Sequence, residues 1–229
     1  MFSAQPCCFN SLLFCFLNKI KTSRLTFSYP GQSLLQFPDL ECGSNEHALI
    51  LGPSGSGKTT MLHLLGGLIS PSSGEIVIGA TSVHTLKGHA LDVFRGKNIG
   101  IIFQKPHFIR SLTALENLEL TQSLSGNKPD KNHALALLER LSIASKAHAM
   151  TNTMSIGEQQ RLAIARALMN HPSLILADEP SSALDDVHCQ RMIELLLQVA
   201  NEQNANLIVV THDSRIKDMI EKRVYLGGG

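Results

Sequence analysis

The sequence predicts an α/β fold in which strands and helices alternate around one core, with an antiparallel β edge and a helical insert. Four short apolar runs bounded by polar residues indicate buried strands at residues 48–51, 99–103, 174–177 and 207–211. A length of 229 residues, 43% of them hydrophobic and 17% charged, is ordinary for a single globular core. Alternating strands and helices are the pattern of an α/β domain.

The edge and the insert are predicted from turns and periodicity. Residues 75–79 follow a Pro-Ser-Ser-Gly turn and indicate an edge hairpin strand. From about residue 113 to 150 the pattern becomes helical, and residues 132–141 carry leucines at spacings of three. The polar stretch 125–129 contains Gly and Pro, which predicts a turn between two helices.

Residues 52–60 match the phosphate-binding pattern G-x-x-x-x-G-K-[ST] between an apolar strand and a helical segment. The candidate nucleotide-binding residues in this loop are Gly52, Pro53, Ser54, Gly55, Ser56, Gly57, Lys58, Thr59 and Thr60. Its glycines let the backbone N–H groups turn towards phosphate oxygens, and the following helix adds its positive end. Lys58 can reach the β- and γ-phosphates, and Thr59 can ligate Mg²⁺. A chance Gly/Ser turn is the alternative, but the strand–loop–helix context predicts binding of a nucleoside triphosphate.

A second apolar strand, residues 174–177, ends in two adjacent carboxylates, Asp178 and Glu179. Beside the phosphate loop, Asp178 would lie near Mg²⁺ through a ligand water. Glu179 would face the γ-phosphate, where a general base polarises water. Taken alone, such a pair is as often a polar cap or turn. The upstream phosphate loop favours the nucleotide role.

Residues 153–161 read Thr-Met-Ser-Ile-Gly-Glu-Gln-Gln-Arg and run into a helical segment, residues 162–168. This stretch resembles the signature motif of the ATP-binding cassette (ABC) ATPases, usually written L-S-G-G-Q/E. Further landmarks of that family stand in order over residues 20–226. They are Tyr29 for the aromatic that stacks on adenine, Gln104 for the Q-loop, residues 182–185 for the D-loop and His212 for the switch histidine.

The resemblance implies a P-loop NTPase (RecA-like) core with a helical insert at about residues 105–170. It also implies two cassettes, expected to form a homodimer, that face each other head to tail around two ATP molecules. Ser155 and Gly157 of one cassette would then bind the phosphates held by the other. Gln104 would join the Mg²⁺ shell.

In the same arrangement, His212 would bind the γ-phosphate and orient the attacking water. Asp185 would reach across the interface towards the opposite phosphate loop. ATP and Mg²⁺ are the expected cofactors, with Lys58, Glu179 and His212 in catalytic roles and Thr59, Gln104 and Asp178 at the metal.

Two departures from the signature pattern bear on these roles. Met154 stands for the usual Leu, a swap that conserves volume. Ile156 stands for the first glycine of the motif. If the contacts come from Ser155 and the Gly157 backbone, the Ile156 side chain can point away. If the position needs a positive φ, a β-branched residue would be strained there.

The chain divides into a cassette at residues 19–229 and an apolar segment at residues 1–18 that carries no charged residue. That first segment is either a peripheral membrane contact or the product of a start codon assigned too early. No apolar run reaches the ~18 residues of a membrane span. Transport would therefore need a separate integral-membrane permease, and the family places its contact groove at residues 105–112. Phe108, Ile109 and Leu112 are the candidates there, or they pack beneath the insert.

A formal net charge of +1 provides no basic field for nucleic acid. The five cysteines show no metal-like spacing and fit a reducing cytoplasm. Residues 62–68, 111–118 and 177–180 resemble the lipoprotein-release and macrolide-export cassettes, which implies a peripheral protein on the cytoplasmic face of the inner membrane. A cell-division-type signalling ATPase would carry the same motifs, and a non-transport cassette is a further alternative. The cargo is not specified by these residues.

Overall fold

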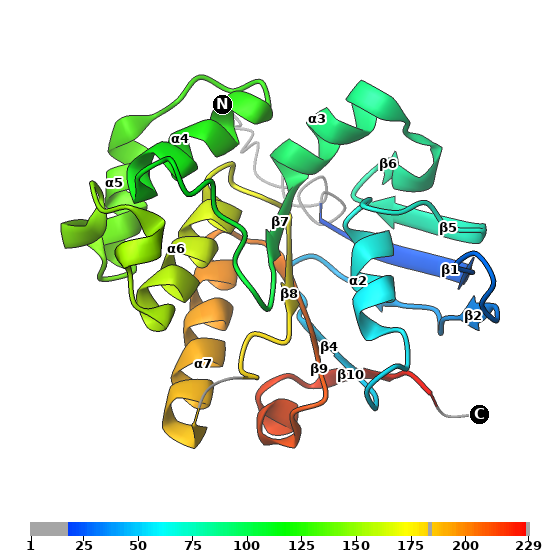
Figure 1. Cartoon of the computed structure of the whole chain (residues 1–229). Helices are drawn as coiled ribbons and strands as arrows, with labels where there is room; N and C mark the ends of the chain where they lie inside the picture. Colours follow the sequence, from blue (N-terminus) through cyan, green and yellow to red (C-terminus); the bar gives the residue numbers. More distant parts are fainter. Residues whose placement is uncertain (1–17, 183–184, 228–229) are drawn as a thin grey trace, which may run out of the picture.

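The computed structural model describes residues 18–182 and 185–227, and its centre is a five-stranded parallel sheet (Figure 1). The strand order is β10-β4-β9-β8-β7. The strands are β4 (Ala48–Leu51), β7 (Ile99–Ile102), β8 (Leu174–Asp178), β9 (Asn206–Thr211) and β10 (Lys222–Tyr225). The four predicted strands are therefore present and adjacent, while β10 was not predicted.

Alternate residues of the central strands enter two different hydrophobic clusters, so both faces of the sheet are buried. Ile175 and Ala177 of β8 face the cluster that contains α6 (Ile156–Leu168) and α7 (Asp186–Glu202). Leu174 and Leu176 face the cluster that contains α2 (Lys58–Leu65). Successive strand side chains point to opposite faces, and a parallel sheet is normally covered on both. This explains why these strands read as continuous apolar runs.

A second sheet is antiparallel and covers the α2 side of the molecule (Figure 1). It consists of β1 (Ile20–Phe27), β2 (Leu35–Gln36), β3 (Glu41–Cys42), β5 (Ser73–Ile78) and β6 (Thr81–Ser82). The strand predicted at residues 75–79 is present as β5 and forms a hairpin with β6, but the prediction that it is an edge strand was wrong, because β5 also pairs with β1. The sequence analysis missed the strand β1, which pairs with β5 along most of its length.

Three α-helices lie in the stretch expected for the insert, and each begins at a side-chain cap. They are α4 (Ala114–Leu124), α5 (Lys131–Arg140) and α6 (Ile156–Leu168), with short 3-10 helices at Ala144–Lys146 and Thr151–Thr153. Thr113 and Ser155 form capping boxes with the glutamate three residues on, and Asp130 caps α5. The predicted turn at residues 125–129 separates α4 from α5.

In the described part of the chain, the other helices flank the central sheet on both sides (Figure 1). They are α2 (Lys58–Leu65), α3 (Gly88–Asn98) and α7 (Asp186–Glu202), with 3-10 helices η1 (Val83–Thr85) and η4 (Ser214–Met219). In the described part of the chain, no helix combines the length and apolar character needed to cross a membrane. The predictions for the N-terminal segment fall outside the described residues, apart from residue 18.

Candidate functional site

The predicted phosphate loop lies between β4 and α2, where two of its glycines take left-handed backbone conformations. Gly55 has φ +82° and Gly57, the residue that caps α2, has φ +92°. A side chain at Gly52 would place its Cβ 2.5 Å from Ser56 Oγ and 2.7 Å from the Leu226 carbonyl oxygen. The loop therefore needs glycine for conformation at two positions and for space at a third.

Lys58 turns back into the loop that precedes it. Its Nζ donates to the carbonyl oxygens of Gly52, at 2.8 Å, and Pro53, at 3.0 Å, and its side chain is only 7% exposed. The same Nζ lies 3.8 Å from Glu179 Oε1. A buried ammonium group thus faces both the loop and the carboxylate predicted to be the base.

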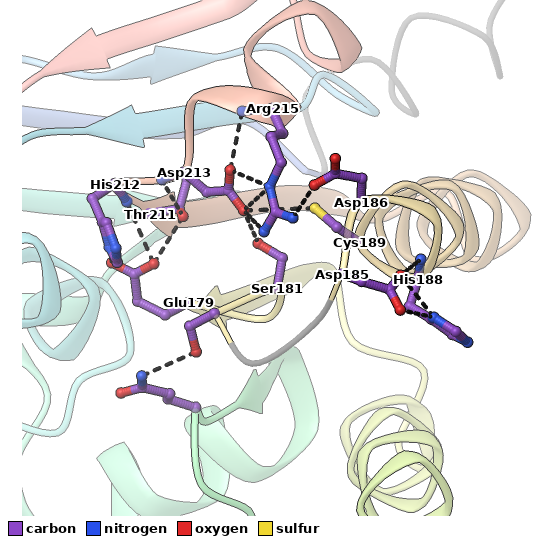
Figure 2. A network of polar contacts seen from close by, with 12 residues as sticks. Glu179, Ser181, Asp185, Asp186, His188, Cys189, Thr211, His212, Asp213 and Arg215 are labelled. Atoms are coloured by element: carbon purple, nitrogen blue, oxygen red, sulfur yellow. Dashed lines mark hydrogen bonds and ion pairs between the residues drawn. The ribbon is translucent and has the colours of Figure 1, made fainter.

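Glu179 follows β8 and has φ +47°, a left-handed conformation that is costly for a residue with a side chain. Its Oε2 accepts a 2.8 Å hydrogen bond from Thr211 Oγ1, and its Oε1 lies 2.8 Å from His212 Nδ1 (Figure 2). The neighbouring strands β8 and β9 end side by side, which brings Glu179 and His212 together. Thr211 was not predicted, although its hydroxyl stands directly before His212 at a strand end.

Thr59 and Asp178, two of the three residues predicted at the metal, contact each other. Thr59 Oγ1 donates to the Asp178 carboxylate at 3.3 and 3.4 Å, and burial raises the pKa of that carboxyl group. Gln104, the third predicted metal residue, donates its amide to Ser182 Oγ at 3.0 Å, a contact that the sequence analysis missed. Oxygen donors of this kind suit Mg²⁺.

Two further residues border the loop. Tyr29 Oη and Thr60 Oγ1 are 3.3 Å apart, and the Tyr29 ring packs edge-on against Phe27. Ser56 Oγ, within the loop, is buried and has no hydrogen-bond partner among the residues that the structure describes. A buried hydroxyl group normally has a partner, so this atom indicates a site that a polar ligand completes.

The signature residues lie at the start of α6, which packs on the opposite face of the central sheet from α2. Ser155 Oγ accepts from the Glu158 N–H, and both Ser155 and Gly157 are exposed. Ile156 is the first residue of α6, and its side chain is 72% exposed. The position is helical, so the strained alternative does not apply. Met154 is buried in the hydrophobic core, a position that a leucine could also occupy.

Asp185 stands directly before α7 and caps it. Its Oδ1 accepts from the His188 N–H at 2.9 Å and lies 2.8 Å from His188 Nδ1. The backbone hydrogen bond and the His188 side chain lower the pKa of Asp185. Residues 183–184 of the predicted D-loop lie outside the described residues. Within one chain, the Asp185 side chain thus bonds to His188 in the first turn of the helix that it caps.

The sequence profile of the family described as "ABC transporter" matches residues 35–182, more than half of the chain. This chain belongs to the ABC transporter family. A relative from Bacteroides thetaiotaomicron named "Lipoprotein-releasing system ATP-binding protein LolD" is 36% identical over 92% of this chain and 97% of its own. A protein of the same name from Treponema denticola is 40% identical over 88% of this chain and 92% of its own.

Solved structures agree with this assignment. The dimeric structure of MJ0796, a bacterial ABC transporter cassette, has a TM-score of 0.80 at 35% identity and covers 90% of this chain and 94% of its own. A second structure of that cassette, in a dimeric post-hydrolysis state with ADP and Pi, has a TM-score of 0.79 at 34% identity, with the same coverage. The present chain is thus an ABC-type ATP-binding cassette with a P-loop NTPase fold, and an ATPase.

Proposed function

We propose that this ATPase powers a separate integral-membrane subunit of the lipoprotein-releasing type. The two relatives described above carry that name and match nearly the whole length of this chain. The carboxylate of Glu179, held between Lys58 and His212, is the observation that carries the chemistry. In this proposal the chain supplies the groups for ATP hydrolysis, and the membrane subunit supplies the path for the cargo.

Each group has a distinct part in hydrolysis. The phosphate-loop N–H groups and Lys58 bind the β- and γ-phosphates, where they stabilise developing negative charge. Glu179 accepts the proton of the attacking water, and His212 orients that water against the γ-phosphate. Tyr29 stacks on the adenine. Because the Glu179 side chain bonds to His212, contacts within the protein itself align the base and its partner.

Mg²⁺ fits beside this cluster. Thr59 and Asp178 converge with hydroxyl and carboxylate oxygens, and Gln104 lies on the loop after β7 at the same end of the sheet. We propose these three residues as its holders, Asp178 through a water. When bound, the ion would neutralise charge on the phosphate oxygens. Its site is distinct from Lys58, which approaches the phosphates from the loop side.

The signature residues of one chain contact the nucleotide that a second copy of the chain holds. Ser155 and Gly157 are exposed at a helix N-terminus, and such an end attracts phosphate. They lie on the far face of the sheet from α2, so they reach nucleotide only when two cassettes meet head to tail. We propose such a homodimer, with Asp185 directed to the partner's phosphate loop.

The exposed Ile156 gives a test of this arrangement. Ser155→Ala removes a charge-assisted hydrogen bond worth about 1.5–3 kcal/mol and is expected to slow turnover about tenfold or more. Ile156→Gly is expected to leave turnover within about threefold, since the side chain points outwards. Steady-state ATPase assays and ATP-driven dimerisation by light scattering measure both effects.

The Ser155→Ala loss should appear in dimerisation, while monomer affinity for ATP stays the same. A gain of about a hundredfold in Ile156→Gly would contradict this reading. It would show that the native signature is impaired and needs a different partner cassette.

The docking surface for the membrane subunit is proposed at a cavity of about 660 Å³ between α3, α4 and α6. Its rim carries Leu124, which is 76% exposed, and its floor includes Gly100 of β7. His107 lines it, but Phe108, Ile109 and Leu112 do not. Phe108 packs against the core beneath Arg166, whereas Ile109 is exposed. We propose that an amphipathic helix of the permease occupies this cavity and holds the cassette at the cytoplasmic face of the membrane.

Co-purification tests this surface. The tagged wild-type chain should bring down an integral-membrane protein, identified by mass spectrometry, from detergent-solubilised native membranes. Leu124→Asp should lower the recovery of that membrane protein about tenfold or more, because burying a charge against an apolar helix costs free energy. The affinity of the variant for ATP should stay the same. Tyr225→Asp is the matched control, since Tyr225 is also exposed but lies outside the cavity. Equal recovery with both variants would place the docking surface elsewhere.

Reconstitution decides between release and signalling. The cassette and its membrane subunit, placed in proteoliposomes that hold a bacterial lipoprotein, should release that lipoprotein only with ATP. ATP hydrolysis without release of lipoprotein would favour the signalling alternative.

A further inference from the structure

A largely buried carboxylate next to the switch histidine connects three segments of the fold. The side chain of Asp213 is 10% exposed. Its Oδ2 accepts from Ser181 Oγ at 3.0 Å and lies 2.7 Å from Arg215 Nη2 and 3.6 Å from Cys189 Sγ (Figure 2). These partners come from the loop after β8, from η4 and from α7. One carboxylate therefore holds segments that are distant in the sequence.

This carboxylate is connected to the proposed base through the backbone. The Asp213 N–H donates to Thr211 Oγ1 at 3.0 Å, and Thr211 Oγ1 donates to Glu179 Oε2 at 2.8 Å. A hydroxyl group has a single proton to donate. Because the Asp213 N–H takes a lone pair of Thr211, the hydroxyl proton is left to point at Glu179. His212, between the two, donates its own N–H to Glu179 Oε2 at 3.4 Å.

The same network reaches both sides of the D-loop. Ser181 stands just before residues 182–185, and Asp186 and Cys189 stand just after them. Arg215 bonds to Asp213 through Nε and Nη2 and to Asp186 Oδ1 through Nη1, at 2.6 Å. The Arg215 side chain lowers the pKa of Asp213, which therefore stays ionised. Its charge is balanced by Arg215, so it acts through geometry and not through its field.

We propose that Asp213 is a positioning residue for ATP hydrolysis, whose carboxylate holds Glu179 and His212 in register with the two ends of the D-loop. The inference rests on the roles proposed above for Glu179 and His212. It predicts that disturbing Asp213 slows the chemical step while nucleotide binding is kept, because its side chain contacts none of the phosphate-loop residues among its described partners.

Asp213→Asn keeps the size of the side chain but replaces one acceptor oxygen by an NH₂ group, so the bonds from Ser181 and Arg215 cannot all be kept. It is expected to lower kcat about tenfold or more, equivalent to about 1.4 kcal/mol in the barrier for each factor of ten. The Kd for ATP, measured by calorimetry, should stay within about twofold. The matched control is Asp218→Asn, the same change at an almost fully exposed aspartate of η4. Its kcat should equal that of wild type.

A double mutant separates positioning from general damage. If Asp213 acts through His212, then the double mutant should have a kcat less than about twofold below that of His212→Ala alone. The proposal would be overturned if the fold-losses in kcat of the two single mutants multiplied in the double mutant. A kcat within twofold of wild type in Asp213→Asn would also overturn it.

Ser181 provides the second set of variants in case Asp213→Asn does not fold. Ser181→Ala should lower kcat about threefold or more, and Ser181→Thr, which keeps the hydroxyl, should restore at least half of the wild-type kcat. Equal kcat in both Ser181 variants would overturn the proposal. Glu179→Gln and His212→Ala are assayed alongside. Wild-type rates in those two would remove the roles on which the inference rests, whereas their loss with an unaffected Asp213→Asn would refute the inference alone.

Discussion

Replacing Glu179 by Gln is expected to abolish steady-state ATP hydrolysis, with the rate falling about 10²–10⁴-fold, while ATP binding is kept. The amide has nearly the shape of the carboxylate but cannot accept the proton of the attacking water. Because the γ-phosphate is no longer cleaved, an ATP-bound dimer should accumulate. Phosphate release measures the first effect, and size-exclusion chromatography with ATP measures the second.

The matched control is Glu194→Gln, the same change on α7, where Glu194 bonds only to Gln190 among its described contacts. That variant should hydrolyse ATP at the wild-type rate. Near-normal hydrolysis in Glu179→Gln would show that another group is the base. A loss of ATP binding in that variant would instead indicate that Glu179 shapes the loop through Lys58, from which it is 3.8 Å distant.

The second large effect is expected for Lys58→Ala, which should weaken ATP binding about 10- to 100-fold. The ammonium group would make charged hydrogen bonds to phosphate, each worth about 1.5–3 kcal/mol. Because Lys58 also donates to the Gly52 and Pro53 carbonyl oxygens, the loop loses internal contacts as well. Calorimetry with ATP measures the affinity directly.

Lys58→Met separates the two causes, since it keeps the buried stem and removes only the charge. It should lose about as much affinity as Lys58→Ala if the phosphate contact dominates. Lys131→Ala, at the exposed start of α5, is the control and should bind ATP normally. Wild-type affinity in Lys58→Met would remove Lys58 from the phosphate site.

Local patterns were sufficient where the chemistry is contained in a short stretch. The phosphate loop needs three closely spaced glycines and a lysine within one short stretch, so its motif could be recognised without any partner segment. The four central strands were predicted because burial on both faces leaves continuous apolar runs. By contrast, β1 and β10 include exposed residues and two charged residues each, so they lack a continuous apolar run, and neither was predicted.

The sequence by itself therefore determined the family, the phosphate loop and the identity of the carboxylates and the histidine after the strands. The tertiary structure decided how they meet. Hydrogen bonding between β8 and β9 places Glu179 beside His212, although 33 residues separate them. It also placed Asp213, Ser181 and Arg215 in one network and put Phe108 beneath Arg166. Such contacts depend on strand order and helix packing, which join residues that no local pattern relates.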